Sequence, residues 1–139
     1  MLKNFIILVI FALISGCSTD ENCEERSFFD DCQLEEPLTG KLNVTVTING
    51  NNPQVTIKIY KGSDYLKGEL VAYNVVSKNE TSFNLPFGEY SGTAVYMIGM
   101  KADSDSILAV DGDDISRELV EYCDSDCWEI TEGNLDLTM

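Results

Sequence analysis

The residues that could carry chemistry in this 139-residue chain are five cysteines and many carboxylates, and there is no histidine. Nucleophilic catalysis by a serine normally needs a base beside the hydroxyl, and the usual base is histidine. Neither of the common glycine-rich phosphate-binding patterns occurs in the chain. Carboxylates are so abundant that finding a pair of them does not indicate glycoside hydrolysis. We therefore predict that the protein is not an enzyme and binds no cofactor.

One group of aspartates could bind calcium, because calcium prefers several oxygen ligands. These aspartates fall within residues 103–114. The segment lacks the third ligand and the loop glycine of an EF-hand, and Asp111-Gly112 is typical of a hairpin turn. We expect solvated turns without a metal here. Calcium is the alternative, and its ligands would be Asp103, Asp105, Asp111 and Asp113.

The amino-terminal segment has the parts of an export signal. Lys3 precedes a short apolar run, and small residues follow that run. The run is too short to cross a bilayer, which takes roughly 20 apolar residues. Its last four residues, Ile14-Ser15-Gly16-Cys17, resemble the lipobox of bacterial lipoproteins. The resemblance implies cleavage before Cys17, lipidation of the Cys17 thiol and a membrane-anchored mature chain. The alternative is an ordinary signal peptide with a cysteine at this position by chance.

The residues that follow Cys17 suggest where in the cell envelope the protein is located. Ser18-Thr19-Asp20-Glu21 resembles the short acidic signals that direct lipoproteins of Bacteroidota to the cell surface. The resemblance implies attachment to the outer membrane and exposure on the cell surface. The alternative is that these residues belong to a solvated linker, because residues 17–39 as a whole form an acidic stalk whose charges repel one another and extend the chain.

The formal net charge of the chain is −15, from 9 basic and 24 acidic residues. Nucleic acid is excluded as a partner, because binding a polyanion requires a cluster of basic residues that displaces counterions, and the lysines here are scattered. The acidic body should also stand away from an anionic lipid surface and stay soluble.

Four cysteines remain if Cys17 carries lipid, and an even number in an exported chain predicts two disulfides. The pairing is open, since four cysteines allow three connectivities. We favour the local pairs Cys23–Cys32 and Cys123–Cys127, the second of which would clamp a hairpin with Asp124-Ser125-Asp126 at its tip. The alternative is a long-range link from the stalk to this hairpin. A zinc site is disfavoured by the absence of histidine and of a Cys-x-x-Cys pair.

From Gly40 onward, apolar and polar residues alternate, which predicts strands. Short strands near every tenth residue, without an amphipathic helix, predict an antiparallel β-sandwich. The expected domains are the signal peptide (1–16), the stalk (17–39) and the sandwich (40–139). The expected strands are 42–48, 55–60, 69–76, 82–85, 90–98, 107–110, 118–123, 127–130 and 135–138.

Ser82 to Tyr90, followed by Ala94-Val95-Tyr96, resembles the strand, Pro-x-Gly turn and tyrosine-bearing strand of transthyretin-like, carboxypeptidase-regulatory-like domains. An immunoglobulin-like sandwich is the alternative. The resemblance implies structural roles: Phe83 and Leu85 in the core, Gly88 at a positive φ, and Tyr90 as a packed ring. It implies no activity, because such domains accompany many functions.

Three aromatic residues are candidate ligand contacts. Trp128 follows Cys127, and core packing against a disulfide is one interpretation of this position, with exposure as a sugar or protein contact as the other. Tyr60 and Tyr65 lie on the polar side of a strand and in a loop. Asp105-Ser106-Ile107 resembles the O-glycosylation motif of Bacteroidota, with Ser106 as acceptor. We expect a non-catalytic binding module for a glycan or protein; the alternative is a structural subunit of an envelope complex.

Overall fold

The structure, a computed structural model, describes residues 33–98, 105–122 and 125–139. The described chain is all-β. Its strands follow one another in the order β1 (Thr39–Val46), β2 (Val55–Lys61), β3 (Glu69–Val76), β4 (Glu80–Pro86), β5 (Gly88–Met97), β6 (Ser106–Tyr122), β7 (Ser125–Thr131) and β8 (Gly133–Leu137).

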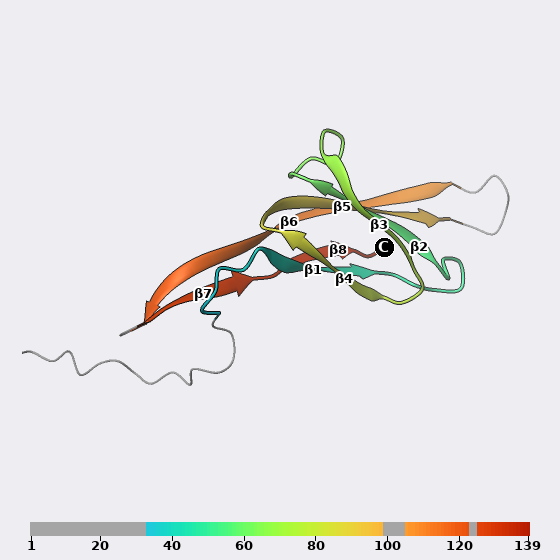
Figure 1. Cartoon of the computed structure of the whole chain (residues 1–139). Coiled ribbons are helices and arrows are strands. Elements are labelled where there is room, and N and C mark those ends of the chain that lie inside the picture. Colours follow the sequence, from blue (N-terminus) through green and yellow to red (C-terminus); the bar gives the residue numbers. More distant parts are fainter. Residues whose placement is uncertain (1–32, 99–104, 123–124) are drawn as a thin grey trace, which may run out of the picture.

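These strands form two sheets that pack together as a β-sandwich, which confirms the predicted fold class (Figure 1). One sheet has the order β4-β1-β8 and the other has the order β3-β2-β5-β6-β7. Neighbouring strands are antiparallel, with one exception, because the first and last strands, β1 and β8, pair in parallel.

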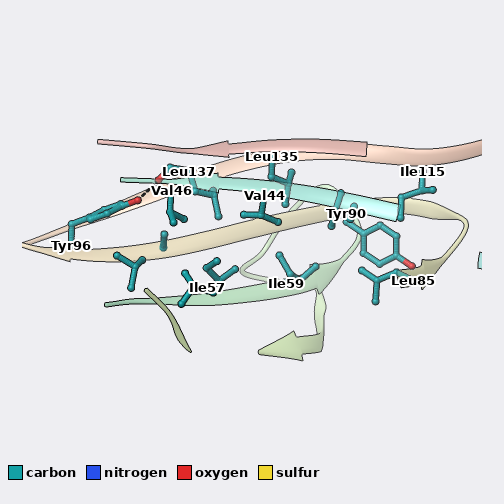
Figure 2. Packing of buried hydrophobic residues seen from close by; sticks show 14 residues of the cluster. Val44, Val46, Ile57, Ile59, Leu85, Tyr90, Tyr96, Ile115, Leu135 and Leu137 are labelled. Carbon is teal, nitrogen blue, oxygen red and sulfur yellow. Dashed lines mark hydrogen bonds between the residues drawn. The ribbon is translucent and has the colours of Figure 1, made fainter. Parts of the chain in front are cut away.

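The core follows from the period-two alternation of the sequence, since successive side chains of a strand point to opposite faces of the sheet. Alternate residues of β1, β2 and β8 are buried between the sheets, as Figure 2 shows for Val44, Ile57 and Leu135. Gly92 of β5 faces the side chain of Leu135 in β8, because a Cβ there would come within 2.6 Å of Cδ1 of Leu135. A larger residue at this position would require the Leu135 side chain to move.

The predicted Pro-x-Gly turn joins β4 to β5. Gly88 has a φ of 144°, a conformation that residues with a Cβ rarely adopt. Tyr90 is buried, and its hydroxyl donates a hydrogen bond to the Pro86 carbonyl oxygen at 2.6 Å. Leu85 is buried and Phe83 packs against the core. The roles expected for Leu85, Gly88 and Tyr90 are therefore confirmed, whereas Phe83 is only partly buried.

The expected hairpin turn at Asp111-Gly112 is wrong. Both residues lie inside β6, which is 17 residues long and joins the two strands predicted at 107–110 and 118–123. Gly112 is the register partner of Ser91 in the middle of β5. The turn propensity of an Asp-Gly pair is local, and a ladder with β5 that runs from Gly88 to Met97 outweighs it.

The second half of β6 leaves the sandwich and forms a two-stranded hairpin with β7, drawn in orange and red in Figure 1. We call residues 116–122 of β6 together with β7 the arm. Tyr122 pairs with Ser125 and Glu121 pairs with Asp126. Ser125 and Asp126 therefore belong to the strand, and the prediction that they form the tip of this hairpin is wrong.

The predicted signal peptide and residues 17–32 of the stalk lie outside the described residues, so the boundaries at 16 and 39 stay predictions. The described part of the chain contains no helix long and apolar enough to cross a membrane.

One buried tyrosine joins the two sheets at the end of the sandwich. The Tyr96 hydroxyl donates to the carbonyl oxygen of Leu137 at 2.6 Å (Figure 2). It also accepts a hydrogen bond from the amide of Thr47 at 2.9 Å. Burial raises the pKa of this phenol.

We predict that Tyr96→Phe lowers the free energy of unfolding by about 1–3 kcal/mol, because it leaves a carbonyl and an amide without their partner. Urea denaturation would measure the change. Tyr60→Phe is the matched control and should change stability by no more than about 0.5 kcal/mol, since that ring is only half-buried. Equal effects of both substitutions would contradict the role assigned to the Tyr96 hydroxyl.

Candidate functional site

Two of the three candidate contact residues come together. Tyr60 lies near the end of β2, and Tyr65 lies in the loop that follows it. Their ring centroids are 6.3 Å apart, with 58° between the ring planes. Both side chains are half-buried. The structure therefore groups Tyr60 with Tyr65 and separates them from Trp128, which lies on the arm.

The loop that positions Tyr65 is held by Asp64. The Asp64 carboxylate accepts a hydrogen bond from the Leu66 amide at 2.9 Å and forms an ion pair with Lys67 at 3.1 Å. The Asp64 carbonyl oxygen accepts from the amides of Lys67 and Gly68. The hydrogen bond from Leu66, with the neighbouring Lys67, lowers the pKa of the Asp64 carboxyl. These bonds hold the loop in a closed turn.

The face of the five-stranded sheet that points away from the core is more apolar than the sequence suggests. Register partners have side chains on the same face of a sheet. One row across the strands therefore contains Val75, Thr56, Val95 and Leu108, and the next row contains Tyr73, Lys58, Thr93 and Val110. We call the surface made by these two rows the outer face.

Five side chains of the outer face are large, apolar and 44–59% exposed. They come from three strands, β3, β5 and β6, and Thr56 and Lys58 of β2 lie between the side chains of β3 and those of β5. Several exposed apolar side chains on one face make that face a candidate interaction site. The five residues are Tyr73, Val75, Val95, Leu108 and Val110.

Trp128 belongs to a second cluster, which is built around Arg117 at the base of the arm. The Arg117 guanidinium lies 5.3 Å from the centroid of the Trp128 ring and 4.8 Å from that of Phe87. Such contacts are attractive, because the face of an aromatic ring is electronegative. Trp128 is half-buried and lies outside the hydrophobic core cluster, so it packs against a cation.

The same guanidinium binds the described end of the stalk. Arg117 forms an ion pair with Glu36 at 2.6 Å and donates a hydrogen bond to the Pro37 carbonyl oxygen. Gln33 and Trp128 exchange backbone hydrogen bonds of 3.1 and 2.8 Å. Residues 33–38 are thus docked on the arm.

The aspartates considered for calcium have a different role in the structure. Asp111 and Asp113 accept hydrogen bonds from the amides of Asp136 and Asn134, both at 2.7 Å. These amides belong to β8, an edge strand, so the two carboxylates occupy donors that would otherwise be open to another chain. Asp105 is exposed, and Asp103 lies outside the described residues. Within the described ranges, no group of three or more metal-ligating side chains forms.

The candidate modification site, Ser106, is the exposed first residue of β6. Its O-glycosylation stays a prediction.

Among the cysteines, only Cys127 is described. It is 1% exposed and is not a free thiol, because it is disulfide-bonded. Cys17, Cys23, Cys32 and Cys123 lie outside the described residues, so the favoured local pairing and the lipidation of Cys17 stay predictions.

Comparison with protein-family models, curated proteins and solved structures finds no match to this chain. A proposal about function must therefore rest on the arrangement of the chain's own residues.

Sequence reasoning missed two parts of this surface. The apolar run Glu69–Val76 is typical of a strand buried on both faces, but β3 is an edge strand whose side chains are mostly exposed. The apolar residues of this run are the sequence signal from which the outer face could have been identified. The role of Arg117 leaves no local pattern, because its partners lie up to 81 residues away along the chain.

We predict that Arg117→Lys releases residues 33–38 from the arm, because an ammonium cannot reproduce the fork of donors and the stacking of a guanidinium. Hydrogen exchange should show faster exchange of the Gln33 and Trp128 amides. Glu36→Gln is the control. It removes only a partly exposed ion pair, worth about 0–1 kcal/mol, and should leave most of the protection in place. The same protection in Arg117→Lys as in the wild type would contradict this role for Arg117.

Proposed function

We propose that this chain is a lipoprotein of the outer membrane that acts as a non-catalytic binding module for another protein. The single observation that supports this function best is the outer face, which exposes five large apolar side chains from β3, β5 and β6. Anchoring rests on the resemblance of Ile14–Cys17 to a lipobox.

The composition of the outer face favours a protein partner over a glycan. Sugar-binding surfaces depend on aromatic rings with polar groups placed around them, whereas the exposed side chains here are mostly valine and leucine. Branched aliphatic side chains pack well against a second apolar surface. The Tyr60–Tyr65 pair lies one row away, opposite Ser91, and is the part of the molecule best suited to a sugar.

The net charge of the protein favours a partner with a positively charged surface. With a net charge of −15, the chain attracts cationic surfaces and repels anionic ones over long distances. A partner with an apolar patch surrounded by basic residues fits both properties. A structural subunit of an envelope complex would use the same surface for a permanent contact.

The membrane anchor has a direct test. Cys17→Ala should abolish incorporation of radiolabelled palmitate and move the protein from the membrane fraction to the soluble fraction, because the several acyl chains of a lipoprotein supply nearly all of the membrane affinity. Cys127→Ala is the control cysteine variant and should keep the label. Membrane association of the Cys17→Ala protein without label would refute the proposed anchor.

The outer face has a separate test. A photoreactive benzophenone amino acid in place of Tyr73 should give a covalent adduct with a protein on intact cells, and Val95→Lys in the same chain should reduce the adduct at least tenfold. A buried lysine costs a complex several kcal/mol, and about 1.4 kcal/mol corresponds to a factor of ten.

Leu119→Lys on the arm is the matched control for this experiment, since Leu119 is 48% exposed and Val95 is 44% exposed. It should leave the adduct unchanged. If Val95→Lys has no effect on the adduct, the outer face is not the binding surface. Specific binding on a glycan array that is lost with Tyr65→Ala would assign the ligand to the tyrosine pair.

A further inference from the structure

We propose that the free side of β3 pairs in antiparallel fashion with the same side of β3 in a second copy of this chain. β3 is the end strand of its sheet, and among the described residues no strand pairs with its other side. We call this free side the β3 edge. The proposal goes beyond the proposed function, because it depends neither on the lipid anchor nor on a partner protein at the outer face.

The backbone groups that β3 presents at this edge follow from the register. The Gly62 amide donates to the Glu89 carbonyl oxygen at 2.8 Å, in register with the ladder between β2 and β5. Backbone groups of an antiparallel strand alternate between its two neighbours, so the odd-numbered residues of 55–59 bond β3. The β3 residues opposite them are Ala72, Asn74 and Val76. The amides and carbonyls of Tyr73 and Val75 therefore point away from β2, to the β3 edge.

The other three edges of the two sheets are protected. Asp111 and Asp113 occupy amides of β8. The free side of β7 bonds Gln33 of the stalk, and β4 ends in Pro86, which has no amide hydrogen. Within the described residues, the β3 edge alone lacks such protection, because Leu70–Val76 contains no charged residue and no proline. An edge strand of this kind is a template for another strand.

The residues of the β3 edge are complementary to themselves when a second copy runs antiparallel. A register that places Tyr73 of one copy opposite Val75 of the other makes two aromatic–β-branched pairs, which stabilise a sheet. Asn74 then lies opposite Asn74 of the second copy. Glu69, which begins one β3, comes next to the turn that contains Lys78 of the other copy. The strand that fits the β3 edge is therefore β3 itself.

The distribution of charge along the chain permits this contact. Residues 55–79, from the start of β2 to the turn after β3, contain four lysines and two acidic residues, so their formal charge is +2. The rest of the chain contains the other 5 basic and 22 acidic residues, a formal charge of −17. A contact through the β3 edge therefore joins parts of the two copies that are not acidic. Repulsion between exposed acidic residues farther apart than about 8 Å is largely screened.

This pairing ends with two copies. Both copies use the same edge, so no β3 edge remains for a third copy. Register partners have side chains on the same face of a sheet, so the two outer faces lie side by side on one joined sheet. A partner protein would then meet two copies of the outer face at once.

Sedimentation equilibrium of the full-length protein in a density-matched detergent measures this association. We expect the wild type to form dimers in equilibrium with monomers. Each Tyr73–Val75 pair exchanges two hydrogen bonds. Val75→Pro removes one bond from each pair and leaves the ladder with β2 intact, so it should raise the dimer dissociation constant about tenfold. A wild type that stays monomeric throughout the concentration series would overturn the proposal.

Two matched variants separate the β3 edge from other surfaces. Ser82→Pro makes the same change on β4, at a residue whose backbone groups point away from β1 by the same alternation. Val95→Lys places a charge on the outer face, away from the edge. Both should leave the dissociation constant unchanged. A loss of dimer in Val95→Lys equal to that in Val75→Pro would assign the contact to the outer face and overturn the edge pairing. Loss of the partner adduct with an intact dimer in Val95→Lys distinguishes the two proposals.

A disulfide between copies tests the register in whole cells. Asn74→Cys places two thiols opposite each other, where the Cα atoms of a non-hydrogen-bonded pair lie about 4.5 Å apart, within the range of a disulfide. With copper phenanthroline as oxidant, non-reducing electrophoresis should show a covalent dimer that reductant dissociates. Asn84→Cys on β4 is the control, since Asn84 is also exposed, and it should stay monomeric. No covalent dimer in Asn74→Cys, or an equal amount in Asn84→Cys, would overturn the pairing even if Val75→Pro fails to fold.

Discussion

The structure depends on the continuous backbone ladder along β6. The first part of this strand pairs with β5, and the part from Ser116 to Tyr122 pairs with β7. Because β6 does not end where the sandwich ends, it carries the arm out of the body as an extension of the same sheet. From its middle, Asp111 and Asp113 also bond the edge of β8 and close one side of the sandwich. The core, the closed edge and the docking site of the stalk are all attached to this one strand.

Much of the fold could be predicted from the sequence, because its signals are local. Alternation in β1 and β2 gave their buried faces, and Pro86 and Gly88 marked a turn whose backbone only glycine adopts easily. The prediction failed at Asp111-Gly112, where a turn-forming pair lies inside a strand. Propensity describes what a short segment prefers alone, and here ten consecutive register pairs with β5 outweigh it.

The candidate site was less predictable, because its contacts are non-local. Tyr60 and Tyr65 were identified by their polar surroundings, and they do meet. Trp128 was identified only as an aromatic residue beside a cysteine, since its stacking on Arg117 depends on the register of the arm. The outer face was missed because the apolar residues of β3 suggest burial, and only the strand order shows that β3 lies at an edge.

The acidic composition and the exposed apolar face of this protein are physically connected. The exposed apolar side chains of β3, β5 and β6 on this face would favour association of two copies through the hydrophobic effect. A charge of −15 on each copy opposes this association, and the repulsion acts most strongly within the Debye length, about 8 Å at physiological ionic strength. Two identical bodies must come closer than this to bury the outer face, whereas a cationic partner is attracted over the same distance. The net charge therefore opposes self-association through the outer face, and the proposed partner of opposite charge would not meet this repulsion.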